Sequence, residues 1–85
     1  MSTYQMRLSN RKAIKRGDPL TAREHDLLRA LARGGTLTVA AQAIGITPDY
    51  SYWLITTARK KLGATTTAQA VALAAIAGLV ELPAP

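Results

Sequence analysis

The stretch of sequence that decides the fold is residues 37–56, which read LTVAAQAIGITPDYSYWLIT. We expect two helical segments to meet at Gly45, because glycine reaches backbone angles that a residue with a Cβ resists. Ala41 is small, as a close crossing of the two helices requires. The positions expected to point inward are Ala40, Ala41, Ile44, Ile46 and Leu54. This spacing predicts a helix-turn-helix, although helix pairs of this kind also occur as plain structural hairpins.

Capping residues mark the starts of the first two predicted helices. Thr21 with Glu24 forms a capping box, in which the hydroxyl and the carboxylate each accept a backbone N–H. The second helix is short, and either Thr36 or Thr38 is its cap. Both helices end at glycines, which supply the conformations that terminate a helix.

The two later helices carry equally clear start signals. Thr47 is a cap followed by Pro48 at the first helical position, where the missing N–H costs nothing and the fixed φ is already helical. Thr66 with Gln69 is a second capping box. The four helices expected from these signals cover residues 21–33, 36–44, 48–62 and 66–77.

These elements define an all-α fold. We expect a four-helix domain with a central helix-turn-helix and a C-terminal helix for packing or dimerisation. The folded domain covers residues 20–80, preceded by a flexible basic arm at 1–19 and followed by a short tail at 81–85. A chain of 85 residues has no room for a second domain.

The chain is basic, with 11 Lys and Arg against 5 Asp and Glu and a formal net charge of +6. This balance favours a polyanionic partner, with nucleic acid first, although it also simply helps a small protein to stay in solution. Cysteine is absent, which excludes disulfides, thiolate metal sites and thiol nucleophiles. His25 lies between Glu24 and Asp26 on a face expected to be exposed, without the partners of an acid–base or metal site. We therefore expect neither an enzyme nor a bound cofactor.

The apolar segments of the sequence indicate where in the cell the protein is expected. Residues 1–10 lack the apolar core of a signal peptide, and the longest apolar run, 70–80, is too short to span a bilayer. These features favour a protein of the cytoplasm that has no membrane partner. With DNA as its partner, it would be associated with the nucleoid.

The helix expected at 66–77 is apolar nearly all round. Such a helix is normally covered on both sides, and one side is enough to pack on the helix at 21–33. We expect a second copy of the chain to cover the other side, although alanine is also simply a strong helix former that needs no partner. The residues predicted to form this dimer interface are Ala68, Ala72, Leu73, Ala75 and Ile76.

Four short motifs agree in order and spacing with a known family. They are LTARE (20–24), GITP (45–48), KKLG (60–63) and AQAVA (68–72). Together they resemble the DNA-binding domain of LuxR/GerE-type bacterial transcription regulators, from residue 20 to about residue 80. The resemblance implies four helices, of which the third enters the major groove, and often a dimer formed through the fourth. Family members usually carry a sensor or receiver domain as well. None is found in this sequence, so the chain looks like a stand-alone module.

Two segments depart from that family. Where the family usually has Thr-Val-Lys-x-His, this chain has YSYWL (50–54), which replaces an inward valine with serine and a DNA-contacting lysine with tyrosine. Residues 36–41, TLTVAA, are more similar to the corresponding segment of LysR-type regulators. The resemblance therefore implies DNA binding in general but not the family's base preferences.

The helical period of residues 48–62 predicts which side chains face DNA. If Leu54, Ile55 and Ala58 lie inside, four side chains face outward as candidate base readers. Hydroxyls bond base edges or phosphate, a threonine methyl meets the thymine methyl, and a carboxylate accepts from a cytosine amino group. The lone tryptophan either contacts DNA or packs in the core. The four residues are Asp49, Tyr52, Trp53 and Thr56, and Tyr50 beside them is a further candidate DNA contact.

Phosphate contacts are expected from hydroxyls and from cations. Thr36, Thr38 and Thr47 lie at helix N-termini, where hydroxyl, backbone N–H and helix dipole suit a phosphate, although capping alone also explains them. For the basic arm three alternatives are open: it runs along the phosphates, enters a minor groove, or is disordered and does not contact DNA. A cluster near the end of the helix at 48–62 either clamps the DNA backbone or is a solvated helix end. This cluster is Arg59, Lys60 and Lys61.

Two functions remain open from the sequence. The first is a DNA-binding transcription regulator that inserts the helix at 48–62 into the major groove, as a homodimer on an inverted repeat. The second is a protein-interaction module that uses Tyr50, Tyr52 and Trp53 to bind RNA polymerase or another transcription factor. The few base-reading side chains favour the second function, and the net charge favours the first.

Overall fold

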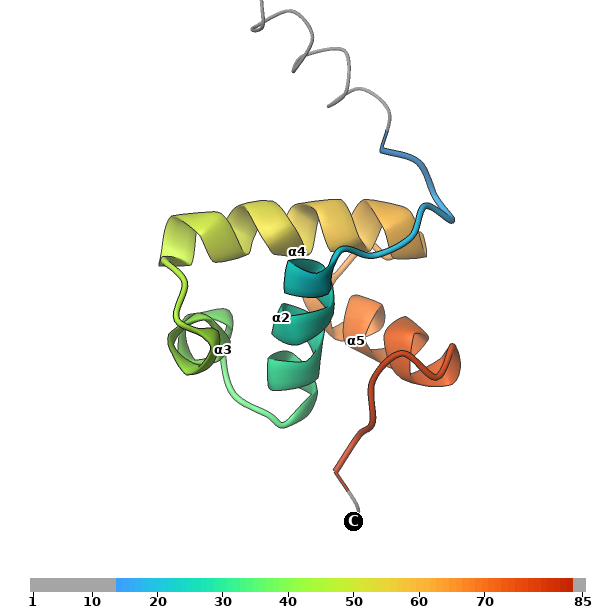
Figure 1. Cartoon of the computed structure of the whole chain (residues 1–85). Coiled ribbons are helices and arrows are strands. Elements are labelled where there is room, and N and C mark those ends of the chain that lie inside the picture. The colour runs from blue at the N-terminus through green and yellow to red at the C-terminus, as the bar shows by residue number, and fades with distance from the viewer. Residues whose placement is uncertain (1–13, 84–85) are drawn as a thin grey trace, which may run out of the picture.

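The computed structural model describes residues 14–83, and these residues form four helices without a strand (Figure 1). With the labels of Figure 1, the helices are α2 (Ala22–Ala32), α3 (Leu37–Ile44), α4 (Pro48–Leu62) and α5 (Thr67–Ile76). The all-α, four-helix prediction is confirmed, and the predicted helix limits agree closely.

The caps explain why the helices begin where they do. The Thr21 N–H donates to Glu24 Oε1 at 2.7 Å while Thr21 Oγ1 accepts from the Glu24 N–H at 3.2 Å, so this capping box is complete. Thr36 caps α3 by accepting from the Val39 N–H at 3.2 Å, which decides between the two expected caps, since Thr38 lies in the first turn of the helix.

The cap of α5 differs from the prediction in one respect. Thr66 Oγ1 accepts the N–H of Gln69 at 3.0 Å, as expected. The Gln69 side chain accepts instead from the N–H and the hydroxyl of Thr65, at 2.7 and 2.9 Å. The reciprocal half of a capping box is therefore wrong here, because the amide oxygen reaches one residue further back along the chain.

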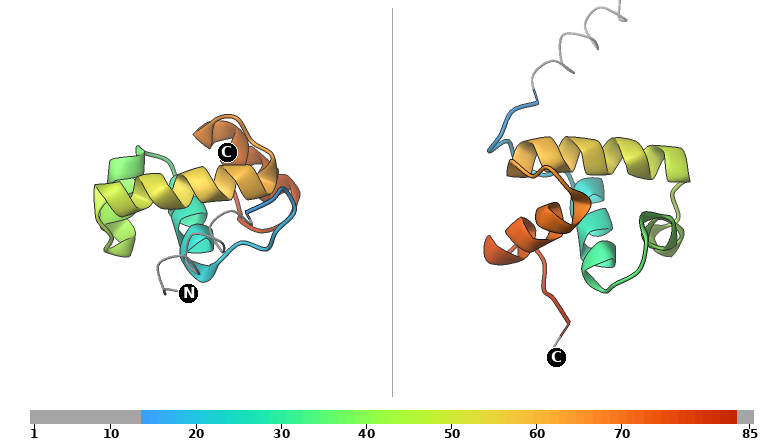
Figure 2. Two further views of the ribbon diagram at one scale, coloured as in Figure 1. Left: turned by 90° about the horizontal axis from the view of Figure 1, so that it is seen from above. Right: turned by 180° about the vertical axis from the view of Figure 1, so that it is seen from behind.

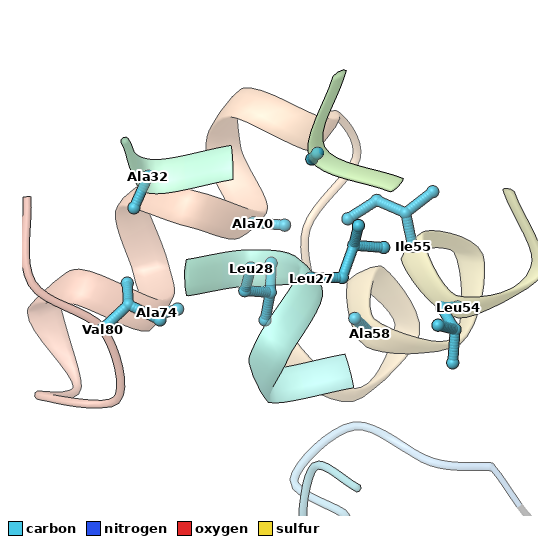
Figure 3. Close-up of a cluster of buried hydrophobic side chains, with 10 residues drawn as sticks. Leu27, Leu28, Ala32, Leu54, Ile55, Ala58, Ala70, Ala74 and Val80 are labelled. Carbon is cyan, nitrogen blue, oxygen red and sulfur yellow. The ribbon is translucent and has the colours of Figure 1, made fainter. Parts of the chain in front are cut away.

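The core is built around α2, which packs against each of the other three helices. α3 and α5 lie on opposite sides of α2, and α4 crosses over it in the view from above (Figure 2). Leu27 and Leu28 are fully buried at the centre, between leucine and isoleucine of α4 and alanines of α5 (Figure 3). Burial of these side chains is the main stabilising contribution in so small a domain.

The helix-turn-helix segment forms as the sequence predicts. Ala40 and Ala41 are buried where α3 packs against α2 and α4. Gly45 ends α3 with a φ of 75°, in the left-handed region that favours glycine. Thr47 caps α4 by accepting from the Tyr50 N–H, and Pro48 occupies the first turn.

The segments on either side of the four helices pack against them. The Gly17 N–H donates to the Lys61 carbonyl at 2.8 Å, so this part of the expected arm is bonded to the C-terminal end of α4. On the other side, Val80 is buried in the core and the His25 ring is hydrogen-bonded to the Leu79 carbonyl. His25 thus ties α2 to the C-terminal segment, a contact that its sequence neighbours do not indicate. Residues 1–13 and 84–85 lie outside the described part of the chain.

Candidate nucleic-acid interface

α4 is the longest of the four helices, with 15 residues, and one of its faces is left uncovered by the other described elements (Figures 1 and 2). Its inner face buries Leu54, Ile55 and Ala58 against the core, as the helical period predicts. Asp49 and Lys60 are exposed on the opposite face. The helix is held by one side and presents the other to solvent.

Aromatic side chains dominate the uncovered face of α4. Tyr52 is 66% exposed and Trp53 is 47% exposed, so Trp53 does not fill the core. Trp53 and the exposed Tyr50 instead border an open recess between α2 and α4 that is also lined by Ile14 and Arg23. Since exposed aromatic rings anchor many binding surfaces, this half of α4 is suited to contact a partner.

Two hydroxyls on α4 bond to the backbone of their own helix. Ser51, at the position where the resembling family carries an inward valine, is 1% exposed and donates to the Pro48 carbonyl at 2.6 Å. Thr56 is half-buried and donates to the Tyr52 carbonyl at 2.8 Å. The bond made by Ser51 satisfies its buried hydroxyl, so serine is accommodated at an inward position. The bond made by Thr56 leaves it an acceptor oxygen and a methyl group for an external partner.

The threonines expected to bind phosphate lie at the starts of α3 and α4. Thr36 and Thr47 are exposed, and the hydroxyl oxygen of each accepts a backbone N–H of its own helix. Thr38 is exposed in the first turn of α3. Capping therefore accounts for Thr36 and Thr47, while the hydroxyl proton of each remains able to donate to a phosphate oxygen.

The basic cluster divides between surface and interior. Lys60 is exposed, and Arg59 is half-buried with an Nε that has no hydrogen-bond partner among the described residues. Lys61 instead donates its ammonium to Glu24 Oε1 at 2.6 Å, with side chains only 10% and 2% exposed. Lys61 is therefore not part of the candidate interface, because its ammonium is paired with the Glu24 carboxylate in the interior.

Sequence reasoning missed this ion pair and its third member. Thr57 is buried and donates its hydroxyl to the Glu24 carboxylate as well as to the Leu54 carbonyl. Burial alone would raise the pKa of the Glu24 carboxyl, but the hydrogen bonds from Lys61, the Thr21 backbone and Thr57 outweigh it and hold the pKa below its ordinary value. The helical spacing of Thr57 and Lys61 was the available signal, since residues four apart share one helix face.

The predicted dimer residues form a line on α5. Ala68, Ala72 and Ile76 are exposed, and Ile76 is 83% exposed. Leu73 and Ala75 flank this line and are half-buried. Ala70 and Ala74 face the core on the opposite side of the helix, so α5 packs by one side only, as expected.

Other kinds of site are not found in the described residues. Within 14–83 there is no group of three His, Cys, Asp or Glu side chains that could hold a metal ion. The helices in this part of the chain are also too short to cross a membrane.

The comparisons with known proteins leave the family open. No family model, curated protein or solved structure matches the chain. The likeness to LuxR/GerE-type domains accordingly stays a prediction that rests on the sequence motifs and their spacing.

Proposed function

We propose that this protein binds double-stranded DNA through the uncovered face of α4, and acts as a transcription regulator. The observation that carries the proposal is the geometry of α4: a long helix, held from one side by α2 and α3, that presents Tyr52, Thr56 and Lys60 to solvent. Helix-turn-helix proteins place such a helix in the major groove.

Charge supports DNA over a neutral partner. The chain carries a formal net charge of +6, and the Lys61–Glu24 pair removes one cation and one anion from the surface without changing that balance. A basic surface draws a duplex by its phosphates before any base is read. Such a regulator would act in the cytoplasm, at the nucleoid.

Binding to random-sequence duplex DNA tests the proposal. Fluorescence anisotropy at salt concentrations from about 50 to 200 mM should show affinity that falls steeply with salt, since bound phosphates release counterions. Lys60→Ala should weaken binding to all sequences and lower the slope of log affinity against log salt by about 0.9.

Arg33→Ala is the matched control. Arg33 is an exposed cation at the far end of α2, which begins at α4 and runs away from it (Figure 1). Both variants remove one surface charge, but only Lys60 lies on α4. Equal effects of the two variants would mean that α4 is not the contact surface.

A homodimer formed through α5 is the second part of the proposal. It is supported by the exposed apolar line of Ala68, Ala72 and Ile76. Ala72→Glu should yield monomers in sedimentation and weaken DNA binding, because a carboxylate would be desolvated in the interface. Ala43→Glu is the control, since it places the same charge on an exposed alanine of α3, a helix that does not contact α5. A wild-type monomer at high micromolar concentration would contradict this part.

A protein-interaction module is the alternative function, favoured by one observation. Tyr50, Tyr52 and Trp53 expose their rings within one turn of α4, as anchors of protein interfaces do. RNA polymerase or another regulator would be the partner. Salt-insensitive capture of such a partner, together with absence of duplex binding, would favour this function over DNA binding.

A further inference from the structure

The first three turns of α4 lack the side chains that usually read purines. Residues 48–58 read PDYSYWLITTA, with no Arg, Lys, Asn or Gln. Those four side chains make the bidentate hydrogen bonds that identify guanine and adenine in the major groove. In helix-turn-helix complexes it is the N-terminal part of the recognition helix that reaches the base edges. Readout here must therefore rest on other chemistry.

Thr56 offers an external partner a methyl group and an acceptor, but not a free donor. Its hydroxyl proton is engaged by the Tyr52 carbonyl at 2.8 Å, one turn earlier in α4. A threonine in this state is poorly suited to donate to the N7 or O6 of guanine. Thr56 as a whole is half-buried, and the hydrogen bond to the Tyr52 carbonyl does not use its methyl group or its remaining lone pair.

Two other side chains of this face add a further acceptor and apolar surface. Asp49 is exposed and its carboxylate only accepts hydrogen bonds. The ring of Tyr52, 66% exposed, adds a broad apolar surface beside Thr56. Apolar contacts in the major groove are made with the C5-methyl group of thymine, the one methyl that the four bases present there.

We propose that the uncovered face of α4 recognises C5-methyl groups of pyrimidines in the major groove, with the Thr56 methyl group as a specificity-determining contact. This inference rests on the proposed DNA binding and specifies what the protein reads. A methyl group buried in such a contact contributes affinity in proportion to the apolar area removed from water.

Matched duplexes isolate this methyl group. The probes are alternating dA–dT and dA–dU duplexes, which differ only by the C5-methyl, and alternating dG–dC duplexes with cytosine or 5-methylcytosine. We expect the methylated member of each pair to bind about fourfold tighter per buried methyl, whichever base carries it.

Two substitutions at Thr56 assign the contact. Thr56→Val keeps the methyl group and the shape but replaces the hydroxyl with a second methyl group, so it should keep the preference for methylated duplexes. Thr56→Ser keeps the hydroxyl and removes the methyl, so the preference should fall by about fourfold. Circular dichroism and thermal unfolding of each variant confirm that the fold is retained.

The outcomes distinguish a failure of methyl recognition from a failure of the proposed DNA binding. Salt-dependent binding to all four duplexes with no methyl preference would overturn the inference and leave DNA binding standing. Loss of the preference in Thr56→Val, with retention in Thr56→Ser, would also overturn it, because the hydroxyl would then be the reader. Absence of binding to any duplex would overturn both the inference and the proposed function.

Discussion

The inner and outer faces of α4 each depart from a simple division into an apolar inside and a charged outside. The inner face carries Lys61 and Thr57 into a buried contact with Glu24 of α2, whereas the outer face carries Tyr52 and Thr56. One cation expected at the surface thus lies inside, while Tyr52 lies outside, as the helical period predicts. The buried pair joins α4 to α2 on the side of the helix that faces away from Tyr52.

Removing the lysine of the buried pair should have the largest effect on stability. Lys61→Ala leaves the carboxylate of Glu24 buried without its cation, which should lower the free energy of unfolding by about 3 to 5 kcal/mol. The adjacent Lys60→Ala should change it by less than about 0.5 kcal/mol, because Lys60 is exposed. Urea denaturation measures both, and similar values for the two variants would contradict the division between faces.

Changing the outer face should affect binding and not stability. Tyr52→Ala should reduce sequence preference in DNA binding by about 1 to 3 kcal/mol if the side chain contacts a base. Its free energy of unfolding should stay within about 0.5 kcal/mol of the wild type, since the ring is 66% exposed. A loss of unfolding free energy as large as that in Lys61→Ala would contradict an exposed position for Tyr52.

Acid should reduce the stability that the Glu24 carboxylate contributes at the inner face. The pKa of Glu24 in the folded chain lies below its ordinary value of 4.5, so between these two values the unfolded chain binds more protons. The stabilising contribution is therefore complete above the ordinary value and is lost as pH falls through the folded pKa. Unfolding measured from pH 6 downward should show this loss, and Glu24→Gln should show a smaller one. An identical pH profile for wild type and variant would contradict the assignment.

Local signals made the helices predictable from the sequence. The caps at Thr21, Thr36 and Thr47 act within four residues of chain, so the residue types that make them stand together in the sequence. The outward direction of Tyr52 followed from the helical period in the same way, because the period fixes which residues share a face.

Contacts between distant residues were not predictable. Glu24 and Lys61 are 37 positions apart, and His25 and Leu79 are 54 apart. No local pattern pairs such residues, because tertiary packing alone brings them together. For this reason Lys61 was expected among the phosphate contacts, and the contact of His25 with the Leu79 carbonyl was not expected.

The most direct test of the central claim is an NMR titration of the protein with duplex DNA. If α4 contacts DNA by its outer face, the backbone amide signals of Asp49, Tyr52, Thr56 and Lys60 should shift most. Those of Arg29 and Arg33, at the far end of α2, should stay nearly constant, although both residues are exposed cations. Shifts centred on Arg29 and Arg33, or no shifts at any residue, would contradict the account.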